Sequence, residues 1–191
     1  GCDAIIEKRA MNIAQQKRRE NIAEYILYLW QLEDLLRALQ FSPEAIYSQF
    51  VAPRNLTEES QNILLMWYMD IVALLREEEK ESSGHLNHTL HLIADMHNLH
   101  LQLMDLPVGA HYRQTFARLE PYLPTLRTAL GKNISDTELC FRALYATMLY
   151  RIKGGENSAI ADTMEYISPV IGELTALYHK VERGEIDLFK E

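Results

Sequence analysis

Histidines are concentrated in one stretch of the chain, between Ser82 and Pro107. This stretch holds five of the seven histidines, which are His85, His88, His91, His97 and His100. Imidazole is a common metal ligand, and it is the side chain that most readily exchanges a proton near neutral pH. The stretch therefore raises two chemical hypotheses, a metal site and an acid–base site.

Turn residues at 82–84 and 107–109 bound this stretch, and the sequence between them is predicted to be one helix. Successive residues of a helix are rotated by about 100°, and this rotation places His88, His91 and Asp95 on one polar arc. Spacings of three and four put these side chains on adjacent turns, where they could share a metal ion. The simpler interpretation is a solvated polar face, because a closed zinc site would need a further ligand from another helix.

A second pair, His97 and His100, falls on the apolar side of the same helix. A histidine there is most often a core residue with both ring nitrogens hydrogen-bonded. The alternative is a buried polar cluster of His97, His100, Glu33 and Asp70, suited to acid–base chemistry or to a carboxylate-rich metal centre. The Glu-x-x-His pairing of di-iron bundles is missing, since Ala94 stands three residues before His97.

Both acids of that cluster interrupt apolar stretches. Glu33 falls inside the wide apolar face of the segment 12–40, and Arg37, one turn further on, is its expected ion-pair partner. Asp70 lies in a segment that is apolar nearly all round, so we expect it to be buried and to have a polar partner.

Apolar residues recur at helical spacing along nearly the whole chain, and no stretch alternates with period two. The predicted helical segments, with their capping and turn residues, run over about 12–40, 43–50, 57–81, 84–107, 110–130, 135–154 and 157–184. Pro121 and Pro124 should kink the fifth segment or divide it into two collinear pieces, and Pro169 should kink or interrupt the last. The predicted fold is all-α, a single helical bundle of about six long helices plus one short helix.

The length of 191 residues fits a single domain, expected over 11–191, with residues 1–10 as an N-terminal extension. A net charge of −8 disfavours nucleic acid and anionic membranes as partners, and the basic cluster at 17–19 is expected to be a solvated helix face. Two cysteines, Cys2 and Cys140, make no disulfide framework, so a cytoplasmic location is expected. No apolar run is long enough to span a membrane.

The sequence contains no GxGxxG, P-loop, GxSxG, HExxH or paired CxxC motif. We expect a non-enzymatic interaction or assembly protein, most simply a homodimer, because 12–40, 57–81 and 84–107 carry more apolar surface than one core absorbs. The alternative is a metal-dependent or acid–base enzyme, or a small-ligand binder, that uses the buried histidine–carboxylate cluster. No cofactor is predicted apart from the metal ion of that hypothesis.

The block NIAQQKRRENIAEYILYLWQLEDLLRALQF, followed by SPEAIY, resembles the opening of a family of bacterial all-helical proteins known as a domain of unknown function. The resemblance is carried mainly by Met11 to Tyr47, and the helix layout extends it over most of the chain. It implies a cytoplasmic, bacterial, helical protein without an assigned activity, so it transfers no catalytic residue to this sequence.

Overall fold

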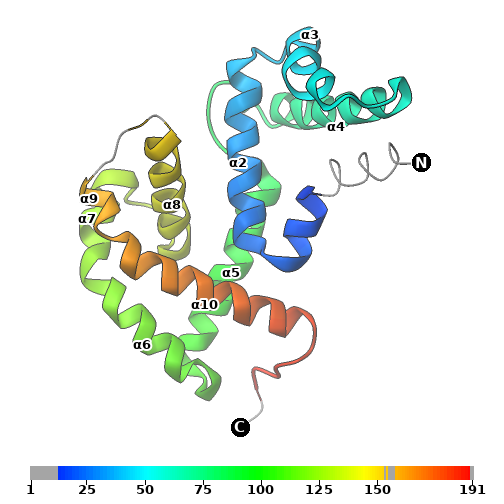
Figure 1. The fold of residues 1–191 in the computed structure, drawn as a ribbon. Helices are drawn as coiled ribbons and strands as arrows, with labels where there is room; N and C mark the ends of the chain where they lie inside the picture. Colours follow the sequence, from blue (N-terminus) through cyan, green and yellow to red (C-terminus); the bar gives the residue numbers. More distant parts are fainter. Residues whose placement is uncertain (1–12, 153, 155–157, 190–191) are drawn as a thin grey trace. The chain divides into compact units, whose positions relative to one another are not determined.

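The computed structural model describes residues 13–152, 154 and 158–189. These residues form helices, short helical turns and loops, and no strand occurs among them (Figure 1). The all-α prediction is confirmed. The predicted extension over residues 1–10 lies outside the described part of the chain. No helix in the described part is long and apolar enough to cross a membrane.

The chain forms two compact units, each described here by itself. Unit 1 comprises residues 1–20 and 24–90, and unit 2 comprises residues 21–23 and 91–191. The first long helix and the histidine helix therefore each contribute residues to both units. The predicted extent of a single domain, residues 11–191, stays a prediction.

The described part of unit 1 begins with helical residues 13–20 and is built mainly from two long helices with short helical turns between them. These elements are α2 (Ile22–Ala38), α3 (Pro43–Ile46), the π turn η1 (Tyr47–Val51), the 3-10 turn η2 (Ala52–Arg54), α4 (Glu58–Glu77) and the first turn of α5 (Asn87–Asp105).

Local signals set the helix starts in unit 1. The Ser42 hydroxyl accepts a hydrogen bond of 3.2 Å from the backbone N–H of Ala45, and Pro43 occupies the first helical position. The Thr57 hydroxyl likewise accepts from the N–H of Ser60 at 3.2 Å. Both caps match the starts that the sequence predicts.

The core of unit 1 joins α2 to α3 and α4. Leu36, Ile46, Leu64 and Leu75 are completely buried in it. Burying one side chain of this size stabilises the fold by about 1.5–3 kcal/mol. These four residues hold α2, α3 and α4 together.

The expectation that α4 is buried all round, and Asp70 with it, is wrong. One face of α4 is buried and carries Tyr68 and Val72, whereas Asp70 is exposed together with Ile63 and Met66. Met66 is 64% exposed. An exposed carboxylate keeps its hydration, so Asp70 needs no protein partner.

Unit 2 continues α5 and adds helices that pack around α10. They are the 3-10 turn η3 (Pro107–Gly109), α6 (Ala110–Leu119), the 3-10 turn η4 (Glu120–Tyr122), α7 (Leu123–Leu130), α8 (Asp136–Ile152), α9 (Ser158–Ala161) and α10 (Met164–Glu182). In Figure 1, α10 packs against both α6 and α8, and α7 packs against α8.

The prolines act partly as the sequence predicts. Pro121 lies in the 3-10 turn that divides the predicted segment 110–130 into α6 and α7. Pro169 lies inside α10, which continues through it. The expected interruption occurs earlier instead, at Asp162 and Thr163 between α9 and α10.

Candidate functional site

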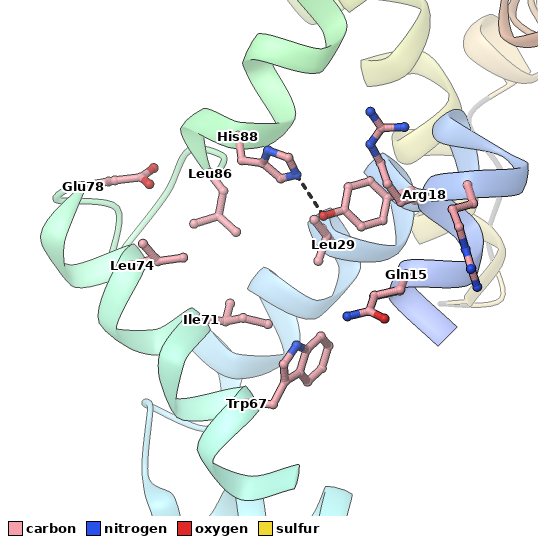
Figure 2. A pocket seen from close by; sticks show the side chains of 12 residues that line it. Gln15, Arg18, Leu29, Trp67, Ile71, Leu74, Glu78, Leu86 and His88 are labelled. Atoms are coloured by element: carbon pink, nitrogen blue, oxygen red, sulfur yellow. Dashed lines mark hydrogen bonds between the residues drawn. The ribbon is translucent and has the colours of Figure 1, made fainter. Parts of the chain in front are cut away.

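A cavity of about 630 Å³ lies within unit 1 (Figure 2). Small-molecule sites in proteins typically enclose about 300–1,000 Å³, so this volume suits a small ligand. Four elements line it, namely the helical residues 13–20, α2, α4 and the start of α5. The lining residues are Ala14, Gln15, Arg18, Arg19, Tyr25, Leu29, Trp67, Ile71, Leu74, Glu78, Leu86 and His88.

Apolar side chains make up most of the cavity wall. Trp67, Ile71 and Leu74 line it from α4, where spacings of four and three place them on one face of the helix. Leu29 of α2 and Leu86, just before α5, complete this wall. A ligand that covers the wall would remove apolar surface from water, which favours binding by roughly 25 cal/mol per Å².

Basic side chains line the cavity from another element. Gln15, Arg18 and Arg19 follow spacings of three and one along the helical residues 13–20. Figure 2 shows Gln15 and Arg18 on the side of the cavity opposite Leu74. The expectation of a solvated basic face agrees with the exposure of Arg19, whereas Lys17 and Arg18 are partly buried and Lys17 pairs with Glu24 at 3.3 Å.

A tyrosine and a histidine meet at the cavity. The Tyr25 hydroxyl and Nε2 of His88 share a hydrogen bond of 2.9 Å (Figure 2). Burial raises the pKa of Tyr25, an effect that the positive charge of Arg18 partly opposes. The phenol therefore keeps its proton at neutral pH and can serve as a hydrogen-bond donor.

A buried carboxylate anchors the wall behind this pair. Glu33 of α2 is completely buried, and it accepts hydrogen bonds of 2.8 Å from Nδ1 of His85 and 2.8 Å from the backbone N–H of Leu86. The His85 ring stacks on Trp30 with centroids 3.7 Å apart, and the Trp30 indole N–H donates to the Thr89 hydroxyl at 2.9 Å. These contacts fix the start of α5, which carries Leu86 and His88 to the cavity.

The expectation that Arg37 is the partner of Glu33 is wrong. Arg37 donates instead to Asp34 at 3.0 Å and to the backbone carbonyls of Lys80 and Gly84. Its long side chain lies toward the loop after α4, whereas Glu33 lies toward the start of α5. Arg37 therefore holds the loop that leads into the histidine helix.

Glu78, the acidic residue that lines the cavity, is hydrogen-bonded and ion-paired to nearby residues of unit 1. It accepts a hydrogen bond of 2.7 Å from the backbone N–H of Asn87 at the start of α5, and it forms an ion pair of 3.4 Å with Lys80. Lys80 also donates to the side chain of Asn87 at 2.7 Å. A carboxylate at a helix N-terminus is stabilised by the helix dipole, so the charge of Glu78 is matched from two directions.

The histidine pair of unit 2 sits in a different environment. His97 and His100 stack with centroids 5.4 Å apart. Nδ1 of His97 shares a hydrogen bond of 3.0 Å with the Thr137 hydroxyl, and Nδ1 of His100 shares one of 2.6 Å with the Tyr112 hydroxyl. The packed surroundings of His100 leave no room for a ligand. The geometry favours the core interpretation of this pair.

Burial controls the protonation of this region. It lowers the pKa of His100 to about 4, assisted by the neighbouring His97 and opposed by Asp136. Burial also raises the pKa of the Tyr112 hydroxyl and raises that of the Cys140 thiol to about 12. All three groups are therefore neutral at neutral pH, as expected of core residues.

The acids predicted to join this pair have other surroundings. Glu33 and Asp70 belong to unit 1, whereas His97 and His100 belong to unit 2. Glu33 is bound to the start of α5 and Asp70 is exposed. The assembly of these four residues into one cluster stays a prediction without support from their contacts.

The predicted metal set is also without support. His88 is bonded to Tyr25, and His91 and Asp95 are exposed on α5. Within residues 13–152, 154 and 158–189, no group of three or more His, Cys, Asp or Glu side chains is arranged to hold a metal ion.

Sequence reasoning did not find the cavity. Its walls come from segments whose apolar residues the sequence predicts to lie in a core or a dimer interface, and its cations come from a predicted solvated face. The one available signal was the apolar surplus of α4, which exceeds what the core of unit 1 covers.

The family model described as "Domain of unknown function (DUF4924)" matches residues 11–185, so the chain belongs to this family. The resemblance predicted from the N-terminal block is thereby confirmed. Searches of curated proteins and of solved structures gave no match.

Proposed function

We propose that unit 1 binds a small, largely apolar molecule in its cavity. The observation that carries this proposal is a space of about 630 Å³ bounded by five large apolar side chains and a few polar ones. Pockets of this size and composition are the usual form of a small-molecule site. The proposed role is binding, because apolar side chains make up most of the lining that the described residues give this cavity.

Preorganisation supports the same proposal. The hydrogen bonds of Glu33 and Glu78 hold the start of α5 in place, so Leu86 and His88 need little rearrangement on binding. When the side chains that line a cavity are already ordered, binding costs less conformational entropy and the affinity is higher. The cavity is therefore suited to binding a ligand without a large change in unit 1.

Binding of the neutral apolar dye Nile red tests the proposal. The full chain should increase the dye's fluorescence, and Leu74→Trp should abolish the increase because the larger ring fills the cavity. Leu35→Trp is the matched control, since Leu35 and Leu74 are both 43% exposed and Leu35 does not line the cavity. Equal dye binding by the two variants, or no binding by the parent protein, would contradict the proposal.

A second proposed role is self-association as a homodimer. The exposed face of α4 supports it, because Ile63, Met66 and Leu74 are 37%, 64% and 43% exposed. Exposed apolar side chains that gather on one helix face, here around the exposed Asp70, commonly mark an interaction site. We also propose a bacterial origin and a cytoplasmic location, which the family resemblance implies. The buried free thiol of Cys140 is compatible with a reducing compartment.

Light scattering at micromolar concentration tests the homodimer. We expect the mass of two chains for the parent protein and of one chain for Met66→Lys. Leu101→Lys is the control, because Leu101 is also exposed, at 51%, but belongs to unit 2. A single-chain mass for the parent protein would end this proposal.

A further inference from the structure

We infer that the molecule bound in the unit 1 cavity is an aliphatic carboxylate, with its headgroup toward Arg18, Arg19 and Tyr25 and its chain against the wall of α4. This inference rests on the proposed binding function. It adds the chemical class of the ligand and the direction in which the ligand lies.

The charges around the cavity favour an anion. Two guanidinium groups, of Arg18 and Arg19, line it against one carboxylate, of Glu78. Lys80 and the first turn of α5 already match the charge of Glu78. The protein as a whole carries a formal charge of −8, so a cavity lined by more cations than anions departs from the rest of its composition.

The polar groups suit a carboxylate in particular. A guanidinium presents a planar set of N–H donors that matches the two oxygens of a carboxylate. Burial raises the pKa of Tyr25, so its hydroxyl keeps its proton, and where Nε2 of His88 is the donor in the hydrogen bond of 2.9 Å this proton is available to a headgroup. A charged headgroup would thus meet donors from two elements of unit 1.

The opposite wall suits a hydrocarbon chain. Ile71 and Leu74 line the cavity from α4, and Arg18 lies on the opposite side of it (Figure 2). A wholly polar ligand would leave these side chains covered by groups that lose their hydration without compensation. A molecule with one anionic end and one apolar end satisfies both sides of the cavity.

Displacement of Nile red from the full chain by three matched ligands tests the ligand class. These are decanoate, decanol and decyltrimethylammonium, each below the concentration at which it aggregates. A hydrogen bond to a charged group contributes about 1.5–3 kcal/mol, so decanoate should bind about tenfold or more tightly than decanol. Decyltrimethylammonium should bind more weakly than decanol, and added salt should weaken decanoate alone.

Variants at the cavity locate the headgroup. Arg19→Gln should weaken decanoate about tenfold and leave decanol unchanged, and Tyr25→Phe should act in the same direction to a smaller extent. Lys17→Gln is the matched control, because Lys17 belongs to the same helical segment and pairs with Glu24 instead of lining the cavity. It should leave decanoate binding unchanged.

The outcomes separate this inference from the proposed function. Equal affinity for all three ligands, or tight dye binding that none of them displaces, would overturn the carboxylate assignment while apolar binding stands. An equal loss of decanoate binding in Arg19→Gln and Lys17→Gln would overturn the placement of the headgroup. Failure of the parent protein to bind Nile red would instead remove the proposed function itself.

Discussion

Replacement of Glu33 by alanine should destabilise the protein strongly. Glu33 is completely buried, and the change removes the acceptor of two hydrogen bonds of 2.8 Å, from His85 and from the N–H of Leu86. Each buried donor that is left without a partner costs about 1–3 kcal/mol, and breaking a buried charged contact typically costs about 3–5 kcal/mol in all. We therefore expect the free energy of unfolding to fall by about 3–5 kcal/mol, out of a typical total of about 5–15 kcal/mol.

Urea unfolding followed by circular dichroism measures this loss, with two variants for comparison. Glu33→Gln retains one acceptor oxygen and should lose about half as much stability as Glu33→Ala. Glu81→Ala removes an exposed acid from the nearby loop and should change the free energy of unfolding by less than about 0.5 kcal/mol. Glu33→Gln should also weaken dye binding, because the start of α5 carries His88 to the cavity.

The result that would refute this reasoning is a Glu33→Ala variant as stable as Glu81→Ala. It would mean that water reaches Glu33 or that its hydrogen bonds are not formed in solution. A loss of stability with unchanged dye binding would refute only the link between Glu33 and the cavity.

Three further predictions concern unit 2. Burial lowers the pKa of His100 to about 4 in the folded chain, against about 6.5 in the unfolded chain. The free energy of unfolding should therefore fall by up to about 3 kcal/mol as the pH drops from 6.5 to 4. Urea titrations at several pH values measure this fall, and His100→Gln should remove most of it. In a Cys2→Ser background, the buried Cys140 thiol, whose pKa is raised to about 12, should react with a thiol reagent at pH 8 only after unfolding. A Cβ at Gly109 would lie 1.9 Å from a backbone carbonyl oxygen of α5, so Gly109→Ala should destabilise the protein by about 1–3 kcal/mol, measured by thermal unfolding. Gly172 lies in α10 with open space where its Cβ would be, so Gly172→Ala should stabilise the protein by about 0.5–1 kcal/mol in the same assay.

Local sequence signals were sufficient to predict the helices. The caps at Ser42 and Thr57 depend on a hydroxyl and on an N–H three residues later, so the sequence alone contains all the participants. Helical periodicity similarly predicts which residues share a face. These relations do not depend on how the helices are arranged in space.

Partners that are distant along the chain could not be predicted in the same way. The expected partner of Glu33 was Arg37, because one helical turn separates them, but its actual partners lie 52 and 53 residues further on. Both arrangements satisfy the rule that a buried carboxylate needs hydrogen bonds. Only the packing of α2 beside the start of α5 decides between them.

The surface of α4 shows the same limit. Its centre is apolar on nearly every side, so periodicity contains no information about which side the protein covers. The structure buries the side of Tyr68 and Val72 and exposes that of Asp70. The histidine stretch was predicted better, since the angular division into two sets separates exposed His88 from buried His100. It could not reveal that His88 meets Tyr25 at a cavity.

The apolar surplus of α4 connects the two proposed roles. Leu74 lines the cavity and is also 43% exposed on the face proposed for self-association. A dimer formed over this face would change the surroundings of the cavity. By thermodynamic linkage, a ligand that binds the monomer and the dimer with different affinities must shift the equilibrium between them. The apparent affinity for Nile red should then depend on protein concentration in the parent protein and not in Met66→Lys. An affinity that is independent of concentration, in a protein shown to dimerise over the same range, would place the dimer interface away from Leu74.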